Sequence, residues 1–255
     1  SSAENLTLNA DGSGNDVLVQ SNGSTKAIVT AEGNVIIGAS SFDQGGFSGS
    51  ATGINVHGVS PLILCKETDT NIRGYVGVAG SDMYVVTPDA RNLYLGTNDT
   101  ARIAIDPTGA VTMPAQPAFS TYIAGNQNNI AINGQVKILF DSEVFDQNAD
   151  FNTSTNTFTA PVTGKYFLAL NLVFGAPDAA AGFYQFAIVT SNRTFVQTNT
   201  IAGSTDPTYW TWNYSILADM DAGDTAYINY YQNVGTAQVD ARGGNETSFS
   251  GYLVA

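Results

Sequence analysis

The aromatic residues of this 255-residue chain are concentrated in its second half. The chain has 13 Phe, 12 Tyr and 2 Trp, of which residues 1–116 contain only five. Because large aromatic side chains provide much of the burial that stabilises a globular core, only the second half has the material for an ordinary core. The first half is rich in Gly, Ser, Thr, Asn, Ala and Val. We therefore expect a thin shaft over residues 1–116 and a globular head over residues 117–255.

The charge of the chain argues against two classes of partner. Only 12% of residues are charged and the net charge is −13, with the acidic excess shared evenly between the two halves. No run of Lys and Arg occurs anywhere in the sequence. A phosphate backbone and an anionic membrane surface would both be repelled. We expect no binding to nucleic acid and no insertion into a membrane.

The pattern of residues predicts an all-β protein. No amphipathic helical period of useful length occurs, and the short alanine run at 179–181 lies between Pro177 and Gly182, which predicts a loop. In the head, short runs of β-branched and aromatic residues predict nine or ten strands of a β-sandwich. They are expected near Phe119–Ile123, Gln135–Phe140, Thr157–Ala160, Lys165–Phe174, Phe183–Val189, Thr194–Thr198, Trp210–Ala218, Thr225–Tyr231 and Ser248–Val254.

The first half contains an internal repeat. KAIVTAEGNVII (Lys26–Ile37) aligns without a gap with RIAIDPTGAVTM (Arg102–Met113). Each copy predicts a short strand, a tight turn and a second short strand. Gly33 and Gly109 occupy equivalent turn positions, where we expect a positive φ angle.

A single hairpin of this kind cannot stabilise itself. An isolated two-stranded hairpin is marginal in water, and repeated units usually bury their apolar face against neighbours. We expect three chains to wind around one axis, so that Val, Ile and Leu side chains from each chain meet inside. Pro114 and Pro117 cannot continue a strand ladder and would form a stiff joint between shaft and head.

The head resembles the complement-q-type globular domains, which share the tumour-necrosis-factor jelly roll. The segments that carry the resemblance are PAFSTYI (117–123), FDSEVFDQNADFNTSTNTFTAPVTGKYFLAL (140–170), LADMDAGDTAYI (217–228) and SFSGYLVA (248–255). Within the second, Phe158, Pro161, Gly164, Tyr166 and Phe167 match the family pattern. The resemblance implies a compact trimer with shared aromatic faces, a turn at Pro161–Gly164, and a hairpin at 217–228.

Two further observations qualify these expectations. The stretch from Phe174 to Tyr209 departs from the family pattern, so ligand specificity carried by its loops does not transfer. The shaft sequence LYLGTNDTARIAIDPTGAVTMP resembles the distal shaft of trimeric bacteriophage tail fibres. A shaft of this type ending in a jelly-roll head is typical of viral receptor-binding proteins.

Two groups of residues suggest chemistry but are better explained structurally. His57 and Cys65 could be a base and a nucleophile, yet the weakly apolar shaft supplies no ordered partner that would activate the thiol. Asp219, Asp221 and Asp224 could hold calcium, but the glycine and the terminal glutamate of a calcium loop are missing. We read the second group as a hairpin turn, and expect no metal and no cofactor.

Four acidic residues could be imagined as a glycosidase pair. Asp141, Glu143, Asp146 and Asp150 lie in segments that we expect to be loops. A glycosidase needs two carboxylates at a defined separation across a sugar ring, which proximity in sequence does not supply. We interpret these residues as solvated loop residues, and we expect no enzyme activity.

The segment YWTWNY (Tyr209–Tyr214) is the best candidate for ligand binding. As a strand, it places Trp210, Trp212 and Tyr214 on one face. An indole ring can stack on a sugar ring, although we expect Trp212 and Tyr214 to fill the core or the trimer axis. Tyr209 and Trp210 lie beside the loop 203–208 and are the better candidates.

Three polar residues complete the predicted site. Asp206 lies in the loop before Tyr209 and could bind sugar hydroxyls. Arg193 and Arg242 are rare cations on an acidic head, and an ordinary surface role is the alternative for both.

These features predict the distal, receptor-binding part of a trimeric phage tail fibre. It would attach to a bacterial surface polysaccharide or lipopolysaccharide, at the tip of an extracellular virion fibre. The abrupt start at Ser1 suggests that an upstream part contacts other tail proteins. The alternatives are a head that only trimerises and caps the shaft, a secreted bacterial lectin-like trimeric adhesin, and an enzyme that trims host polysaccharide.

Overall fold

The computed structural model describes residues 17–21, 24–29, 35–37, 54–56, 62–66 and 73–255. Contacts divide the chain into an N-terminal unit, Ser1–Thr112, and a C-terminal unit, Met113–Ala255. Every regular element among the described residues is a β-strand, which confirms the all-β prediction. The segment MPAQPAF opens the C-terminal unit.

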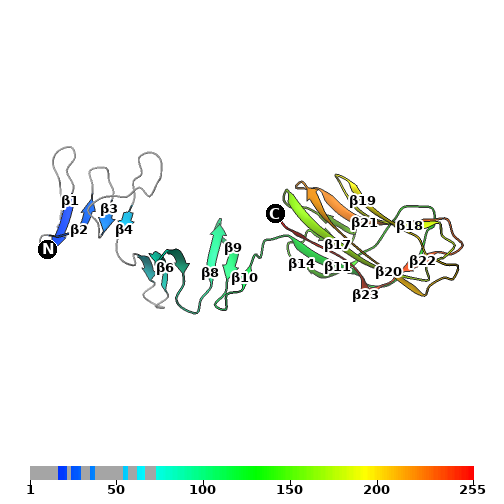
Figure 1. The fold of residues 1–255 in the computed structure, drawn as a ribbon, viewed down its shortest axis with the longest axis horizontal. Coiled ribbons are helices and arrows are strands. Elements are labelled where there is room, and N and C mark those ends of the chain that lie inside the picture. The colour runs from blue at the N-terminus through cyan, green and yellow to red at the C-terminus, as the bar shows by residue number, and fades with distance from the viewer. Residues whose placement is uncertain (1–16, 22–23, 30–34, 38–53, 57–61, 67–72) are drawn as a thin grey trace. The chain divides into compact units, whose positions relative to one another are not determined.

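The N-terminal unit contains three small sheets (Figure 1). The sheets are β1-β2-β3-β4, β5-β6-β7 and β8-β9-β10, and every pair is antiparallel except β3 and β4. The strands are β1 (Val17–Ser21), β2 (Ser24–Val29), β3 (Val35–Ile37), β4 (Ile54–Val56), β5 (Leu62–Lys66), β6 (Arg73–Ala79), β7 (Asp82–Val86), β8 (Leu93–Thr97), β9 (Thr100–Ile105) and β10 (Val111–Thr112).

Both copies of the predicted repeat form hairpins. In the first copy β2 pairs antiparallel with β3, and in the second β9 pairs antiparallel with β10. Gly109 has a φ angle of 91°, as its turn position requires, while Gly33 lies outside the described residues. The Asp106 carboxylate holds the second turn by accepting hydrogen bonds from the backbone N–H groups of Thr108 and Ala110.

The described part of the N-terminal unit has no core of its own. All buried hydrophobic residues among those described lie between Phe119 and Phe249. In the β5-β6-β7 sheet, Ile63, Val76 and Val85 are cross-strand neighbours on one face and are 53%, 40% and 48% exposed. We call this the apolar shaft face; its exposed members are Ile63, Cys65, Val76, Val78, Met83 and Val85.

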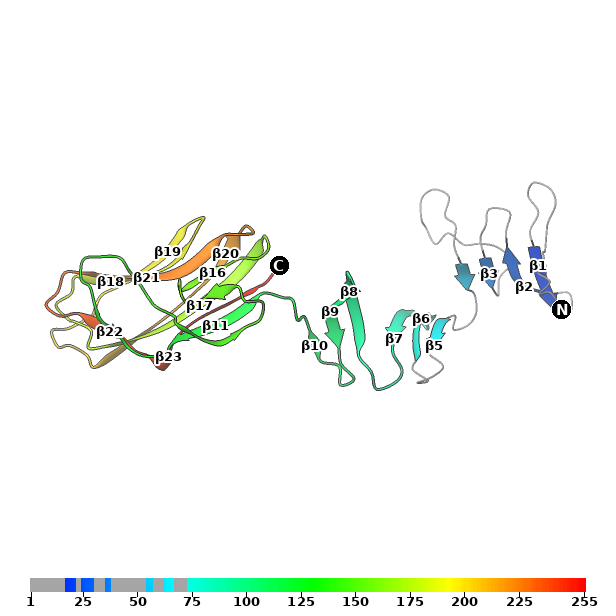
Figure 2. The same cartoon turned by 180° about the vertical axis from the view of Figure 1, so that it is seen from behind.

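The C-terminal unit is a sandwich of two antiparallel sheets (Figure 2). Sheet D has the order β12-β22-β17-β23-β11-β14, with β20 also paired to β17; sheet E has the order β15-β16-β21-β18-β19, with β13 also paired to β21. The strands are β11 (Ala118–Ile123), β12 (Gln127–Ile130), β13 (Val136–Lys137), β14 (Ser142–Asp146), β15 (Phe151–Asn152), β16 (Thr157–Thr159), β17 (Gly164–Gly175), β18 (Phe183–Thr190), β19 (Thr194–Asn199), β20 (Tyr209–Met220), β21 (Thr225–Asn233), β22 (Val239–Ala241) and β23 (Gly244–Leu253).

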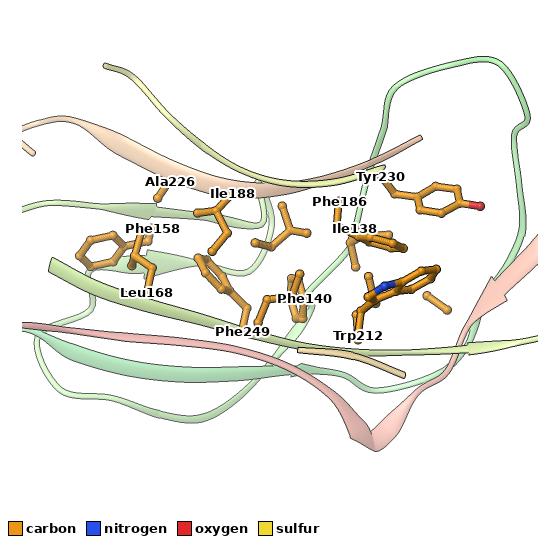
Figure 3. Packing of buried hydrophobic residues seen from close by; sticks show 14 of the residues in the cluster. Ile138, Phe140, Phe158, Leu168, Phe186, Ile188, Trp212, Ala226, Tyr230 and Phe249 are labelled. Atoms are coloured by element: carbon orange, nitrogen blue, oxygen red, sulfur yellow. The ribbon is translucent and has the colours of Figure 1, made fainter. Parts of the chain in front are cut away.

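The core lies between the two sheets (Figure 3). Phe158, Leu168 and Phe249 point into this layer at one end, and Phe186 and Trp212 fill it at the other. Along β17 the side chains from Tyr166 to Asn171 alternate between buried and partly exposed, which fits the predicted strand over Lys165–Phe174. Aromatic rings supply much of the packing, which explains why the second half of the chain holds most of them.

All nine predicted strands of the head are present, but the prediction missed four others. The missed strands are β12, β14, β15 and β22. The prediction that Glu143 and Asp146 lie in loops was therefore wrong, because both belong to β14, which pairs with β11. This strand lies at the edge of sheet D and has a register shift, so its residues do not alternate cleanly between polar and apolar.

The prediction of a hairpin at 217–228 was also wrong. Strand β20 pairs with β17 in sheet D, whereas β21 belongs to sheet E, so the turn at 221–224 connects the two sheets. The Asp224 carboxylate stabilises this connection by accepting hydrogen bonds from the Asp221 N–H and from Asn192 Nδ2, both at 2.8 Å. No group of acidic, His or Cys side chains suited to a metal occurs among the described residues.

We expect Asp150→Asn to raise the free energy of unfolding at pH 7. Burial, and then the charge of Asp146, raise the pKa of Asp150 in the folded protein, and its buried Oδ2 has no hydrogen-bond partner. A raised folded pKa stabilises the fold below the unfolded pKa, and this stabilisation is lost as the pH rises through the folded pKa. Denaturant unfolding should show a higher free energy of unfolding for Asp150→Asn than for wild type at pH 7, and this difference should shrink toward pH 4.

The matched control for this prediction is Asp221→Asn, in an exposed turn where the carboxylate accepts none of the described hydrogen bonds. Asp221→Asn should change the free energy of unfolding by no more than about 0.5 kcal/mol at pH 7 and at pH 4. A loss of stability in Asp150→Asn at pH 7 would show that the carboxylate is stabilising as an anion.

Candidate functional site

Three loops meet at one end of the C-terminal unit, and we call this the loop end. It is formed by residues 176–182, 200–208 and 234–238, and lies opposite the end that holds the C-terminus (Figure 1). The first two loops are joined by hydrogen bonds from the Ala176 N–H to the Thr208 carbonyl (3.0 Å) and from the Ala179 N–H to the Asp206 carboxylate (2.8 Å). The loop end is thus a connected surface.

A buried carboxylate ties the third loop to the first. Asp178 is 1% exposed and accepts hydrogen bonds from the backbone N–H groups of Thr236, Ala237 (2.8 Å) and Ala180 (2.7 Å). Burial pushes the pKa of Asp178 upward, but these hydrogen bonds outweigh burial and hold the pKa below its usual value. Asp178 therefore works as a permanent anion that organises the loops.

Tyr184 extends this buried network. Its hydroxyl donates to the Asp178 carbonyl at 2.8 Å and accepts from the Asp178 N–H at 2.7 Å. Burial raises the pKa of Tyr184 to about 12, so the hydroxyl keeps its proton at physiological pH. Both hydrogen bonds therefore hold the start of the 176–182 loop in place.

The exposed part of the candidate site is formed by Tyr209 and Arg242. Tyr209 opens β20 at the loop end and is 56% exposed, and the Arg242 guanidinium carbon lies 5.5 Å from the centre of its ring. Gly175 lies between them on β17, and a Cβ there would come within 3.2 Å of the Arg242 side chain. Arg242 also approaches the Glu246 carboxylate at 3.5 Å. Glycine at position 175 thus allows the arginine to cross the strand and meet the aromatic ring.

Trp210 and Trp212 differ in burial. Trp212 is 5% exposed and belongs to the core. Trp210 is half-buried and stacks on Trp212, with ring centres 4.4 Å apart. Tyr214 is partly buried and also packs against the core. Trp210 therefore presents only part of its ring at the surface.

The structure brings four of the five predicted site residues to the loop end and separates the fifth. Asp206 is exposed there, although its carboxylate is engaged by the Ala179 N–H. Arg193 lies at the opposite end of β20, where it forms a 2.9 Å ion pair with Asp219. Arg193 therefore cannot act together with Tyr209 within one chain.

Sequence reasoning missed several residues of the loop end. Asp178 was overlooked because two of its bonding partners, Thr236 and Ala237, lie far along the chain, although an Asp between a proline and a short alanine run is a turn signal. Asp240 was also missed; its carboxylate accepts from the Asn129 N–H at 2.7 Å. The exposed groups are a phenol ring, a guanidinium and carboxylates. This set suits hydrogen bonding and stacking with a hydroxyl-rich ligand.

Comparison with known proteins gives a family match, one similar protein and similar solved structures. Residues 118–254 match the family model of the C1q domain. Outer membrane protein SlpA of Deinococcus radiodurans is 31% identical over 175 residues, which cover 59% of this chain and 15% of SlpA, so the match spans a small part of that relative. Among the residues that the structure describes, no helix is both long and apolar enough to cross a membrane.

Two solved structures are similar to part of this chain. The globular domain of zebrafish complement 1qA protein has 16% identity and a TM-score of 0.41, and the match covers 55% of this chain and 98% of that one. Murine APRIL, crystallised at pH 8.0, has 10% identity and a TM-score of 0.42, covering 55% of this chain and 99% of that one.

Proposed function

This chain belongs to the C1q domain family through residues 118–254, and from that premise we propose that it is a homotrimeric attachment protein. In this proposal three N-terminal units form a shaft, and three C-terminal units present their loop ends to a glycan on a cell surface. Its mechanism is multivalent: three weak sites held on one support gain avidity through a high effective concentration.

The apolar shaft face is the observation that carries the proposal. Its six exposed members include no charged side chain. Ile63, Val76 and Val85 line a groove of about 790 Å³, which Arg73 and Arg91 also line. An exposed apolar strip of this kind is stabilised by removing it from water. A second and a third copy of the same strip are the partners that match it in chemistry and length, which favours a shared interior over a free surface.

The outer face of sheet D supports trimer formation in the C-terminal unit. Phe167, Leu217 and Tyr252 are cross-strand neighbours there. Leu217 is 59% exposed, and the rings of Phe167 and Tyr252 lie 5.5 Å apart. The next row along these strands consists of Ala169, Ser215 and Ser250, small residues that permit close approach. We assign this face to contacts between copies.

The biological setting that fits best is the tip of a phage tail fibre, outside the cell and attached to bacterial polysaccharide or lipopolysaccharide. The supporting features are the resemblance of residues 93–114 to fibre shafts and the order of shaft followed by head. A second candidate is a bacterial surface adhesin, which the similarity to the outer membrane protein SlpA favours. In both settings the chain binds glycan without cleaving it, so the size distribution of a bound polysaccharide should stay unchanged.

We expect Tyr209→Ala and Arg242→Ala each to weaken binding to cell-surface glycans by at least about tenfold, as loss of a central aromatic or arginine contact typically does. Arrays of bacterial polysaccharides probed with the full chain would measure the effect. Arg193→Ala is the matched control, because it removes a cation at the opposite end of β20. Weakened binding in Arg193→Ala with normal binding in Arg242→Ala would move the site away from the loop end.

A further inference from the structure

The outer face of sheet E contains a small hollow whose floor is one alanine. The side chain of Ala187 on β18 points away from the core, and its cross-strand neighbours are Val196 on β19 and Asn229 on β21. The larger side chains of Gln185 and Val189 flank it along β18. A small residue among larger ones leaves a depression of about 240 Å³.

The rim of this hollow combines one aromatic ring with three amides. Tyr227 and Asn229 stand on β21, Gln185 on β18, and Gln135 just before β13. Among the described hydrogen bonds, only Gln185 uses its side chain, donating to Thr198 at 3.2 Å. The amides of Gln135 and Asn229, and the Gln185 oxygen, are therefore free to donate to or accept from a ligand.

The hollow is uncharged although the chain has a net charge of −13. Neither a carboxylate nor a cation is among its lining residues, and the neighbouring Lys137 is engaged elsewhere. The Lys137 ammonium lies 4.3 Å from the centre of the Tyr227 ring and donates to the Thr155 carbonyl and to Thr157 Oγ1, both at 2.6 Å. A charged ligand would find no opposite charge here, whereas a neutral ligand with hydroxyl groups would find three amides.

We propose that this hollow binds one neutral sugar residue. Its volume lies below the usual range for ligand pockets, about 300–1,000 Å³, which suits a single pyranose ring. The C–H face of the sugar ring lies over Ala187 and Val196, and the aromatic ring of Tyr227 lies at the edge of the sugar. Its hydroxyls exchange hydrogen bonds with Gln135, Gln185 and Asn229, amides that can each donate and accept.

This site is independent of the one at the loop end. The hollow lies on the outer face of sheet E, whereas Tyr209 and Arg242 lie at the end of sheet D. It also faces away from the Phe167–Leu217–Tyr252 row that we assign to trimer contacts, since that row lies on the outer face of the other sheet. Each chain of a trimer therefore keeps its hollow accessible. The proposal goes beyond attachment through the loop end and gives each chain a second contact with a glycan.

Two substitutions change the hollow in different ways and are expected to leave the fold intact. Ala187→Ile fills the hollow from its floor with a β-branched side chain that strands accept. Asn229→Ala removes one amide and leaves the volume open. Asn128→Ala on β12 is the control, an exposed amide on the other sheet. Tyr209→Ala tests whether the two sites are separate.

The experiment is saturation-transfer NMR on the full chain with methyl glycosides of glucose, galactose, mannose and N-acetylglucosamine, and with methyl glucuronide as the charged probe. We expect at least one neutral glycoside to bind. Ala187→Ile should abolish its signal, and Asn229→Ala should weaken binding about two- to tenfold, the loss expected for one amide hydrogen-bond partner. Asn128→Ala and Tyr209→Ala should leave it unchanged.

Each of the following results would overturn the proposal. One is equal binding of the neutral glycosides to wild type and Ala187→Ile, and another is preferential binding of the glucuronide. The third is a change of oligomeric mass in Ala187→Ile, measured by sedimentation, because it would show that another copy of the chain covers the hollow. If only Tyr209→Ala lost glycoside binding, the glycoside would bind at the loop end and not in the hollow. The proposal of attachment through the loop end would then still hold.

Discussion

Val76→Glu is expected to open the N-terminal unit while leaving the C-terminal unit folded. Val76 lies at the centre of the apolar shaft face, between Ile63 and Val85. If copies of this face meet, the substitution buries one carboxylate per chain among apolar side chains, at a cost of at least about 3 kcal/mol each. Since cleavage follows the population of the open state, trypsin should cut after Arg91 and Arg102 about a hundredfold faster.

The control is Ser81→Glu, which adds the same charge in the exposed turn between β6 and β7 of the same hairpin. Its cleavage rate should equal that of wild type. Equal resistance of Val76→Glu and wild type would mean that the apolar shaft face stays in water, and the proposed shared interior would be wrong.

Asp178→Asn is expected to lower the free energy of unfolding of the C-terminal unit by about 3 kcal/mol. One carboxylate oxygen accepts from Thr236 and Ala237 and the other from Ala180, so the amide N–H₂ of asparagine must face at least one N–H group in either orientation. A buried donor left without an acceptor costs about 1–3 kcal/mol, and the hydrogen bonds to the charge are lost as well. Denaturant unfolding followed by tryptophan fluorescence would measure the change.

Asp206→Asn is the matched control at the same end of the sandwich. Asp206 is exposed and its carboxylate accepts one hydrogen bond, from the Ala179 N–H. We expect its cost to be no more than about 1 kcal/mol. Equal effects of the two substitutions would show that Asp178 does not organise the loops.

The same carboxylate predicts how stability depends on pH. The folded pKa of Asp178 lies below its ordinary value of 3.8. Its stabilising contribution is therefore complete above the unfolded pKa and is lost as the pH falls through the folded pKa. The difference in unfolding free energy between wild type and Asp178→Asn should be constant from pH 8 to pH 5 and should narrow below pH 4. A difference that stays constant down to pH 2 would contradict this account.

Much of the fold could be predicted because the relevant signals are local. The alternation from Tyr166 to Asn171 marks the core strand β17, and the turn at Gly109 needs a positive φ angle that glycine adopts readily. The concentration of aromatic residues after residue 116 indicated where the core lies. Each of these features depends on residues close together in the chain.

The errors arose where the structure depends on distant partners. Strands β20 and β21 are adjacent in sequence and look like a hairpin, but each pairs with a different sheet. The edge strand β14 was read as a loop because its register shift breaks the alternation. The network around Asp178 and the hollow over Ala187 each join segments that no spacing in the sequence brings together. Arg193 was grouped with Tyr209 for its charge alone, and the structure places it at the other end of the strand.

The mass of the full chain in dilute buffer tests the central claim most directly. One chain has a mass of 26.7 kDa. If partner chains complete the interior of the N-terminal unit, sedimentation equilibrium at low micromolar concentration should give three times this value. A folded species with the mass of one chain, resistant to trypsin throughout residues 73–112, would contradict the account.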